Sequence, residues 1–196
     1  MNDYKLAVDE LFSKNTLVNS NYFKLNHYYL ESAYSELLQG NLKVANSYFS
    51  VIDSPRSLWA MRLIKLFLDD KSDVPTYFQI RNFLEIDMNL FILKNKEEYI
   101  KKMFDNAKLF YQINSESYKF FARVLMNNNL YNEAKVYIEN SKKEFYNDPE
   151  LHYMDMLYYF HNKDYKLALK SVENCLKIIP EYYPAKRAKE KLIKLY

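Results

Sequence analysis

Glycine is almost missing from this sequence of 196 residues, which has one glycine where about 14 would be average. Glycine-rich phosphate loops, dinucleotide-binding turns and type I′ hairpins all need glycine, because their backbone adopts positive φ or approaches a ligand closely. A single cysteine, Cys175, excludes an internal disulfide framework. These deficits exclude several function classes and favour a chain that is nearly all helix.

Long apolar runs are missing too. The longest covers only a few residues, as in 90–93, whereas a membrane span needs about 18. The N-terminal residues lack the basic and apolar regions of a signal peptide. We therefore expect a soluble, cytoplasmic protein without a membrane span, with a periplasmic or complex-associated protein as the alternatives.

Charge is nearly balanced. Lysine and arginine number 28 and aspartate and glutamate 25, which leaves a net charge of +3. That is too little to indicate a nucleic-acid surface. Nucleic acid is therefore a disfavoured partner, and a protein or peptide is the favoured one.

The second half of the chain contains a repeat of 34 residues. Segments 129–138 and 163–172 have similar residues at the same places. The matching pairs are Tyr131 and Tyr165, Ala134 and Ala168, Ile138 and Val172, and Ser141 and Cys175. One period earlier, a fainter match puts Ile100, Phe104 and Ala107 in the places of Ala134, Ile138 and Ser141. A period of 34 with two helices per repeat is typical of tetratricopeptide repeats, and this sequence resembles that family.

The resemblance is strongest over 164–180, where Ala168 is small because a neighbouring helix crosses close to it and Pro180 ends the helix. An earlier unit surrounds Gly40, at a corner where the family often has glycine. The small position of the first helix holds Ala33 and Ala122 in two repeats. In the other two repeats, this position falls on Met88 and Met156, or on Asp87 and Asp155 if the corner, the turn between the two helices of a repeat, is one residue longer.

We therefore predict an all-α fold, a right-handed α-solenoid of antiparallel helix pairs with about ten helices, in a single domain over 1–196. The predicted segments are a capping helix (1–25), a repeat (26–55), an irregular unit (56–80), three repeats (81–114, 115–148 and 149–182) and a second capping helix (183–196). Three helix starts are predicted where a capping residue stands near a proline, at 54–55, 73–75 and 148–149.

No constellation of catalytic or metal-binding residues stands out. Cys175 occupies a repeat position that predicts buried packing, and His152 and His161 lack the spacing of metal ligands. Asp87 and Asp155 occupy matching places in first helices. Either they share a role in binding a basic ligand, or each faces the groove or caps a tyrosine. We predict that the protein is not an enzyme and binds no metal or cofactor.

The resemblance implies a concave face, lined by first helices, that takes a peptide or a partner helix. The predicted groove residues are Tyr34, Leu37, Asn89, Lys119, Arg123, Met126, Tyr153, Leu157 and Phe160. Aromatic residues stand where a carboxylate clamp of this family needs polar groups. We therefore expect a mixed aromatic groove in which Lys119 and Arg123 attract an acidic residue of an apolar-aromatic segment.

The predicted function is a protein-interaction scaffold or adaptor. A secretion or assembly chaperone and a helical-repeat RNA-binding protein are the alternatives, and self-association into a homodimer stays open. The basic tail over 184–196 is interpreted as a solvating cap helix, or else as a docking site for an acidic partner or a phosphate backbone.

Overall fold

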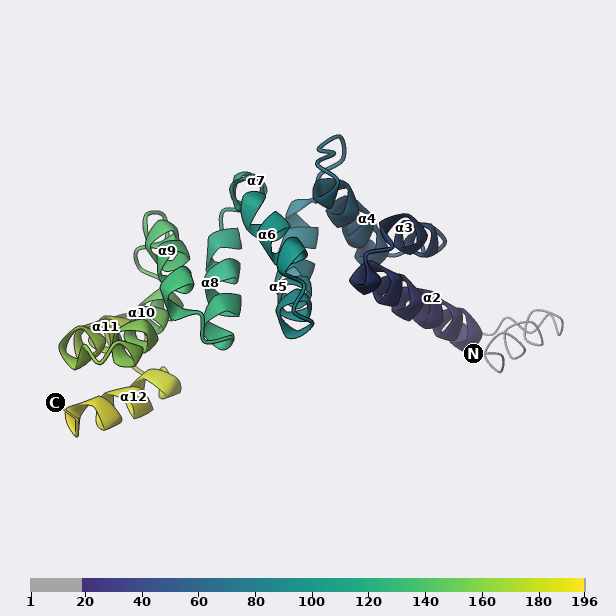
Figure 1. Cartoon of the computed structure of the whole chain (residues 1–196). Coiled ribbons are helices and arrows are strands. Elements are labelled where there is room, and N and C mark those ends of the chain that lie inside the picture. Colours follow the sequence, from purple (N-terminus) through teal and green to yellow (C-terminus); the bar gives the residue numbers. More distant parts are fainter. Residues whose placement is uncertain (1–18, 196) are drawn as a thin grey trace. The chain divides into compact units, whose positions relative to one another are not determined.

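A computed structural model describes residues 19–195 of the chain, and within them it contains eleven helices and no strand (Figure 1). Successive helices pack in adjacent pairs, so the predicted all-α class is confirmed. The predicted capping helix over 1–25 lies outside the described residues as far as residue 18. Its remainder belongs to α2, which runs unbroken over Asn19–Gln39.

The chain forms two compact units that divide after Pro75, where we predicted a single domain. The first unit contains α2, α3 (Leu42–Ser50) and α4 (Pro55–Phe67). The helices of the second unit are α5 (Tyr77–Leu93), α6 (Glu97–Asp105), α7 (Ala107–Ile113), α8 (Ser117–Asn127), α9 (Tyr131–Lys142), α10 (Pro149–His161), α11 (Tyr165–Ile178) and α12 (Tyr183–Ile193). Each unit has its own buried aromatic residues, such as Phe49 and Trp59 in the first and Phe91 and Phe121 in the second.

Five helices end on the same kind of corner. A residue with positive φ stands one or two positions after each helix, and these residues are Gly40 (87°), Asp69 (62°), Asn95 (52°), Asn129 (62°) and Lys163 (61°). At Asn129, its N–H donates to the carbonyl of Met126 at 3.1 Å, and the Leu130 N–H donates to that of Leu125 at 2.9 Å. This pair of bonds is the Schellman motif, which satisfies the last carbonyls of a helix.

The corners settle the register of the first helices. Asn95, Asn129 and Lys163 stand 34 residues apart, so the corner has the same length in all three repeats. Met88 and Met156 therefore occupy the place of Ala122, and both are buried. The alternative with Asp87 and Asp155 at the small position is wrong.

The second helices follow the predicted packing except in α6. Ala45, Ala134 and Ala168, each five residues after a corner, are fully buried. In α6, Tyr99 and Met103 are buried, whereas Ile100 and Phe104 are half-buried. The buried positions of α6 are thus displaced by one residue from those that the repeat predicts. This corresponds to a rotation of the helix by about 100° about its own axis. The physical reason is size, because Ile100 and Met88 stand at the two positions that alanines occupy in the α8–α9 pair.

Two of the three predicted helix starts are confirmed. The Ser54 side chain accepts a hydrogen bond from the Ser57 N–H at 3.1 Å, with Pro55 in the first turn of α4. The Asp148 side chain accepts from the Glu150 N–H at 2.8 Å at the start of α10.

The third predicted start is wrong. α5 begins only at Tyr77, and its N-cap is Thr76, which forms a capping box with Gln79. Asp73 instead forms ion pairs with Arg62 at 2.8 Å and with Lys65 at 3.3 Å. The carboxylate therefore holds the loop after α4 rather than starting the next helix.

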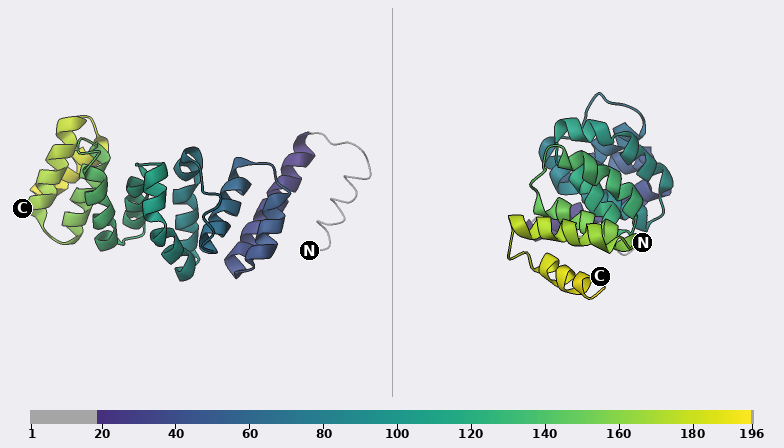
Figure 2. Two further views of the ribbon diagram at one scale, coloured as in Figure 1. Left: turned by 90° about the horizontal axis from the view of Figure 1, so that it is seen from above. Right: turned by 90° about the vertical axis from the view of Figure 1, so that its left-hand side faces the viewer.

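The end of the second unit is covered by α12, which lies beside α11 (Figure 2). Together with α10 and α11, α12 encloses a buried cluster of Met156, Ala168, Val172, Cys175, Ala185 and Leu192. The helix predicted over 183–196 is thus present, and it buries the apolar face that α11 would otherwise expose.

Candidate functional site

A pocket of about 410 Å³ lies between α10 and α12 in the second unit. Its α10 wall consists of Tyr153, Met156, Leu157 and Phe160, and its α12 wall of Tyr183, Pro184, Arg187, Ala188, Lys191 and Leu192. Three of the predicted groove residues, Tyr153, Leu157 and Phe160, are thus brought together. The wall opposite them comes from a helix that the prediction treated only as a cap or a separate docking tail.

Helical spacing explains both walls. Leu157 and Phe160 follow Tyr153 by four and seven residues, which places the three side chains on one face of α10. Arg187 follows Tyr183 by four residues on α12 in the same way. The two helices are joined at one end by a ring contact between Tyr153 and Tyr182, whose centroids are 5.6 Å apart at 81°.

The rim of the pocket is aromatic and basic. Phe160 is 41 % exposed and Tyr183 is 66 % exposed. The Arg187 guanidinium lies 5.8 Å from the centroid of the Tyr183 ring, where a cation–π contact forms. The pocket thus offers apolar rings for contact and positive charge at its edge.

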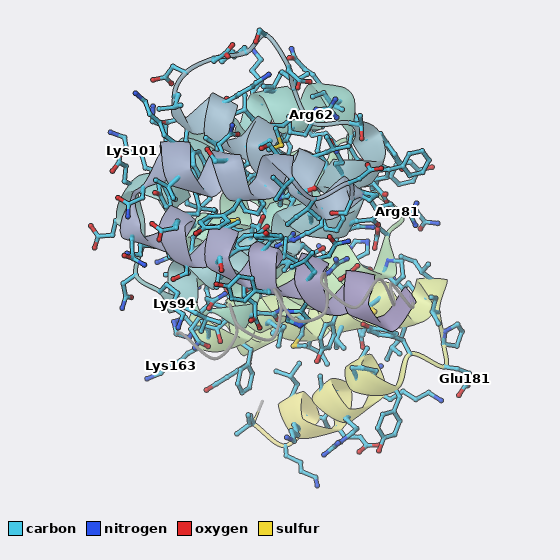
Figure 3. The ribbon with its side chains drawn as sticks, turned by 90° about the vertical axis from the view of Figure 1, so that its right-hand side faces the viewer. Arg62, Arg81, Lys94, Lys101, Lys163 and Glu181 are labelled. Atoms are coloured by element: carbon cyan, nitrogen blue, oxygen red, sulfur yellow. The ribbon has the colours of Figure 1, made fainter. Side chains whose placement is uncertain are left out.

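Two of the basic residues of α12 already have acidic partners. Lys186 pairs with Glu181 at 2.5 Å, and Lys189 pairs with Glu173 at 3.1 Å. Glu181 lies just before the start of α12 (Figure 3). Within residues 19–195, neither Arg187 nor Lys191 forms an ion pair. The unpaired positive charge of α12 therefore faces the pocket.

The predicted basic pair, Lys119 and Arg123, is occupied by carboxylates of the chain itself. Lys119 Nζ lies 2.9 Å from Asp148 and 3.4 Å from Glu116. The Arg123 guanidinium binds both carboxylate oxygens of Glu150, at 2.6 and 2.9 Å, and also pairs with Glu85. Four carboxylates thus surround two bases, and the cluster has surplus negative charge. Lys119 and Arg123 thus offer no unpaired charge here, and the expectation that this pair would attract an acidic residue stays a prediction.

Burial and charge shift the protonation equilibria in this cluster. Burial alone would lower the pKa of Lys119, but the hydrogen bond and the charge of Asp148 outweigh it and raise that pKa. The hydrogen bond from Arg123 to Glu150 likewise raises the pKa of the guanidinium. Burial raises the pKa of Glu85 despite the nearby Arg123, and Glu150 adds to the rise by repulsion.

Four other predicted groove residues lie elsewhere. Leu37 is fully buried and Met126 is 6 % exposed, so both belong to the core and their assignment to a binding surface is wrong. Asn89 accepts a hydrogen bond from Asn128 at 2.8 Å and thereby ties α5 to the end of α8. Tyr34 belongs to the first unit, where its ring packs edge-on against Phe49.

The two carboxylates that stood out in the sequence are both buried, Asp87 fully and Asp155 at 3 % exposure. Asp155 pairs with two lysines of α9, with Lys135 at 2.7 Å and with Lys142. Lys135 also lies 4.6 Å from the centroid of the Tyr159 ring. Asp155 is therefore an internal ion-pair partner rather than a groove residue.

The histidines and the cysteine have contacts within the chain. His152 Nε2 lies 3.1 Å from the Tyr146 carbonyl oxygen, and the His161 ring stacks on Tyr131 with centroids 4.2 Å apart. Cys175 is fully buried, as predicted, and burial raises the pKa of its thiol to about 11. Such a thiol is a poor nucleophile at neutral pH.

Residues 19–195 contain no helix whose length and apolar content would let it cross a membrane. In the same range, no three histidine, cysteine, aspartate or glutamate side chains converge as metal ligands.

The residues that the prediction missed are Tyr183, Arg187 and Lys191. The basic tail was visible in the sequence, but five lysines and arginines in thirteen residues do not reveal which of them face a pocket. The spacing of four residues from Tyr183 to Arg187 and on to Lys191 was the one available signal, because it marks a common helix face.

Comparisons with protein-family models, curated proteins and solved structures found no match to this chain. The resemblance to tetratricopeptide repeats therefore stays a prediction, and the functional conclusion depends on the pocket itself.

Proposed function

We propose that this chain is a protein-interaction scaffold that holds a segment of a partner protein in the pocket between α10 and α12. The observation that carries the proposal is the pocket of about 410 Å³ with rings on one wall and unpaired positive charge on the other. Its volume falls in the range of about 300–1,000 Å³ that small ligands and side-chain anchors fill. Exposed aromatic side chains around such a pocket are the usual anchors of protein contacts.

The proposal includes a tetratricopeptide-like repeat architecture. Its support is the recurrence of the corner at Asn95, Asn129 and Lys163 and the buried alanines that follow two of these corners. Repeats of this kind expose one helix of each pair along a shared face. The proposed binding site is only the last part of that face, because ion pairs occupy the part near Lys119 and Arg123.

The experiment compares captured proteins between two variants. Phe160→Ala with Tyr183→Ala removes two exposed rings from the pocket. Phe78→Ala with Tyr146→Ala is the matched control, because these rings are 70 % and 76 % exposed and do not line the pocket. We expect a polypeptide captured from native lysate by the wild type and the control to be lost with the pocket variant, and purified partner to reproduce the result.

Two outcomes would contradict the proposal. If the pocket variant captures the partner as well as the wild type does, the partner does not bind in the α10–α12 pocket. Loss with the control variant alone would place the binding surface near Phe78 or Tyr146.

A further inference from the structure

We propose that the segment held between α10 and α12 is an acidic-aromatic peptide, in which a carboxylate lies close to a large apolar or aromatic side chain. This inference rests on the proposed function and names the chemistry of the partner. It follows from three features of the pocket: its unpaired charge, its apolar wall and the surplus negative charge of the neighbouring cluster.

The unpaired positive charge of α12 favours a ligand that carries a carboxylate. Arg187 and Lys191 stand one helical turn apart on the pocket side of α12 and are both exposed. Glu181 and Glu173 neutralise Lys186 and Lys189 instead. A carboxylate placed between Arg187 and Lys191 would therefore gain two charged partners without breaking an ion pair of the chain.

The apolar α10 wall favours a ligand with a large apolar side chain beside that carboxylate. Met156 is buried and Leu157 is partly buried, whereas Phe160 is 41 % exposed. A phenylalanine, tyrosine or leucine of the partner would bury its surface against them. The α12 wall and the α10 wall face each other across one pocket, so the acidic residue and the apolar residue of the ligand are neighbours.

The neighbouring cluster argues against a long polyanion. Glu150 lies one turn before Tyr153 on α10, and its cluster holds four carboxylates against two bases. Tyr182, at the start of α12, is close enough that burial first and then the charge of Glu150 raise the pKa of its hydroxyl. A nucleic-acid backbone that extended from Arg187 toward the start of α10 would meet this negative charge. A short peptide with a separate carboxylate avoids it.

The test uses the full chain and peptides of known composition. Random peptides displayed on phage are selected against the wild type, against Arg187→Glu with Lys191→Glu, and against Lys94→Glu with Lys101→Glu. Lys94 and Lys101, labelled in Figure 3, are exposed and do not line the pocket. The control replaces two basic residues by two glutamates, as the pocket variant does, and so changes the net charge equally. The strongest binder is then synthesised twice, as selected and with asparagine for each aspartate and glutamine for each glutamate.

We expect the wild type and the control to enrich peptides that pair an acidic residue with an aromatic or large aliphatic one. The neutral counterpart should bind at least about tenfold more weakly, and the Arg187→Glu with Lys191→Glu variant should lose the acidic peptide by a similar factor. The affinity for the acidic peptide should also fall as salt rises.

Each failure has a separate reading. If neutral apolar peptides are enriched and are lost with Phe160→Ala and Tyr183→Ala but not with the charge reversal, the inference is overturned while the scaffold function stands. If selected peptides bind the Phe160→Ala with Tyr183→Ala variant as well as the wild type, the proposed function fails at this pocket. If a single-stranded RNA homopolymer binds tightly and the charge reversal abolishes this binding, the ligand is a polyanion rather than a peptide. That result would overturn the inference.

Discussion

Asp155 carries a negative charge into the second unit, where its side chain is 4 % exposed and lies between Lys135 and Lys142 of α9. A buried carboxylate is tolerated only with charged partners, because desolvation of an unpaired charge costs several kcal/mol. The two lysines therefore have a structural role, and the same pairing connects α9 to the next first helix, α10.

We expect Asp155→Asn to lower the free energy of unfolding by about 3 kcal/mol or more, because Lys135 and Lys142 both lose a buried charged partner. Urea denaturation at neutral pH measures this. The control is Glu139→Gln, which removes the other carboxylate near Lys135. Glu139 is 55 % exposed, so its loss should cost about 0.5 kcal/mol or less. Equal effects of the two variants would contradict the assigned role of Asp155.

His152 predicts a pH dependence of stability. Burial, and next the charge of Lys142, lower the pKa of its imidazole below the ordinary value of 6.5. The folded state therefore disfavours the protonated form. The stability contribution is present above the unfolded pKa and is lost as pH falls through the lower folded pKa. We expect His152→Gln to lose less stability than the wild type between about pH 7 and pH 5. Parallel stability curves for the two proteins would contradict this.

At the scale of elements, the corner is the feature that recurs most regularly. Gly40, Asn95, Asn129 and Lys163 all adopt positive φ at the end of a first helix, although only one of them is glycine. Asparagine tolerates this conformation and lysine does so at a cost. Positive φ at the end of a first helix therefore recurs more regularly than any one residue type at that position.

Two substitutions at these corners should have opposite signs. Gly40→Ala should cost about 1 kcal/mol, because alanine disfavours a φ of 87°. The new Cβ would meet no atom within 4 Å, so the cost is conformational. Lys163→Gly should raise stability by about 0.5 kcal/mol, because glycine relieves the strain at a φ of 61°. Thermal unfolding measures both effects. A Gly40→Ala variant with unchanged stability would contradict the argument.

At the scale of the whole molecule, the described chain consists of two compact units that divide after Pro75. The segment from Leu68 to Ser72 between α4 and α5 is exposed, and each unit buries its own aromatic residues. Independent cores joined by an exposed polar segment are the usual mark of separate domains.

We expect limited trypsin digestion to cut first at Lys71, because exposed loop tips are preferred sites of cleavage. Both fragments should keep their helical circular dichroism, and the larger one should still unfold cooperatively. Lys71→Gln is the control that should protect the chain. Loss of helical signal immediately after the first cut would show that the two units depend on each other.

Local features of the fold could be predicted from the sequence. The caps at Ser54 and Asp148 and the glycine corner at Gly40 depend on residues within about one helical turn of each other. The buried alanines of α3, α9 and α11 recur at a fixed distance from a corner. Such features follow from backbone hydrogen bonds and helical periodicity, which a single sequence displays directly. The one-residue error in α6 arose because the sizes of Met88 and Ile100 matter only when two helices cross.

Only the tertiary structure decided which charged residues are free. The sequence determined that Lys119, Arg123, Arg187 and Lys191 are basic residues on helices, but an ion pair depends on which helices become neighbours. The packing of α8 beside α10 brings Asp148 to Lys119 and Glu150 to Arg123. The packing of α12 on α11 instead brings Arg187 and Lys191 to Phe160. The pocket between α10 and α12 is therefore a product of contacts between residues about 30 positions apart in the sequence, beyond the range of local periodicity.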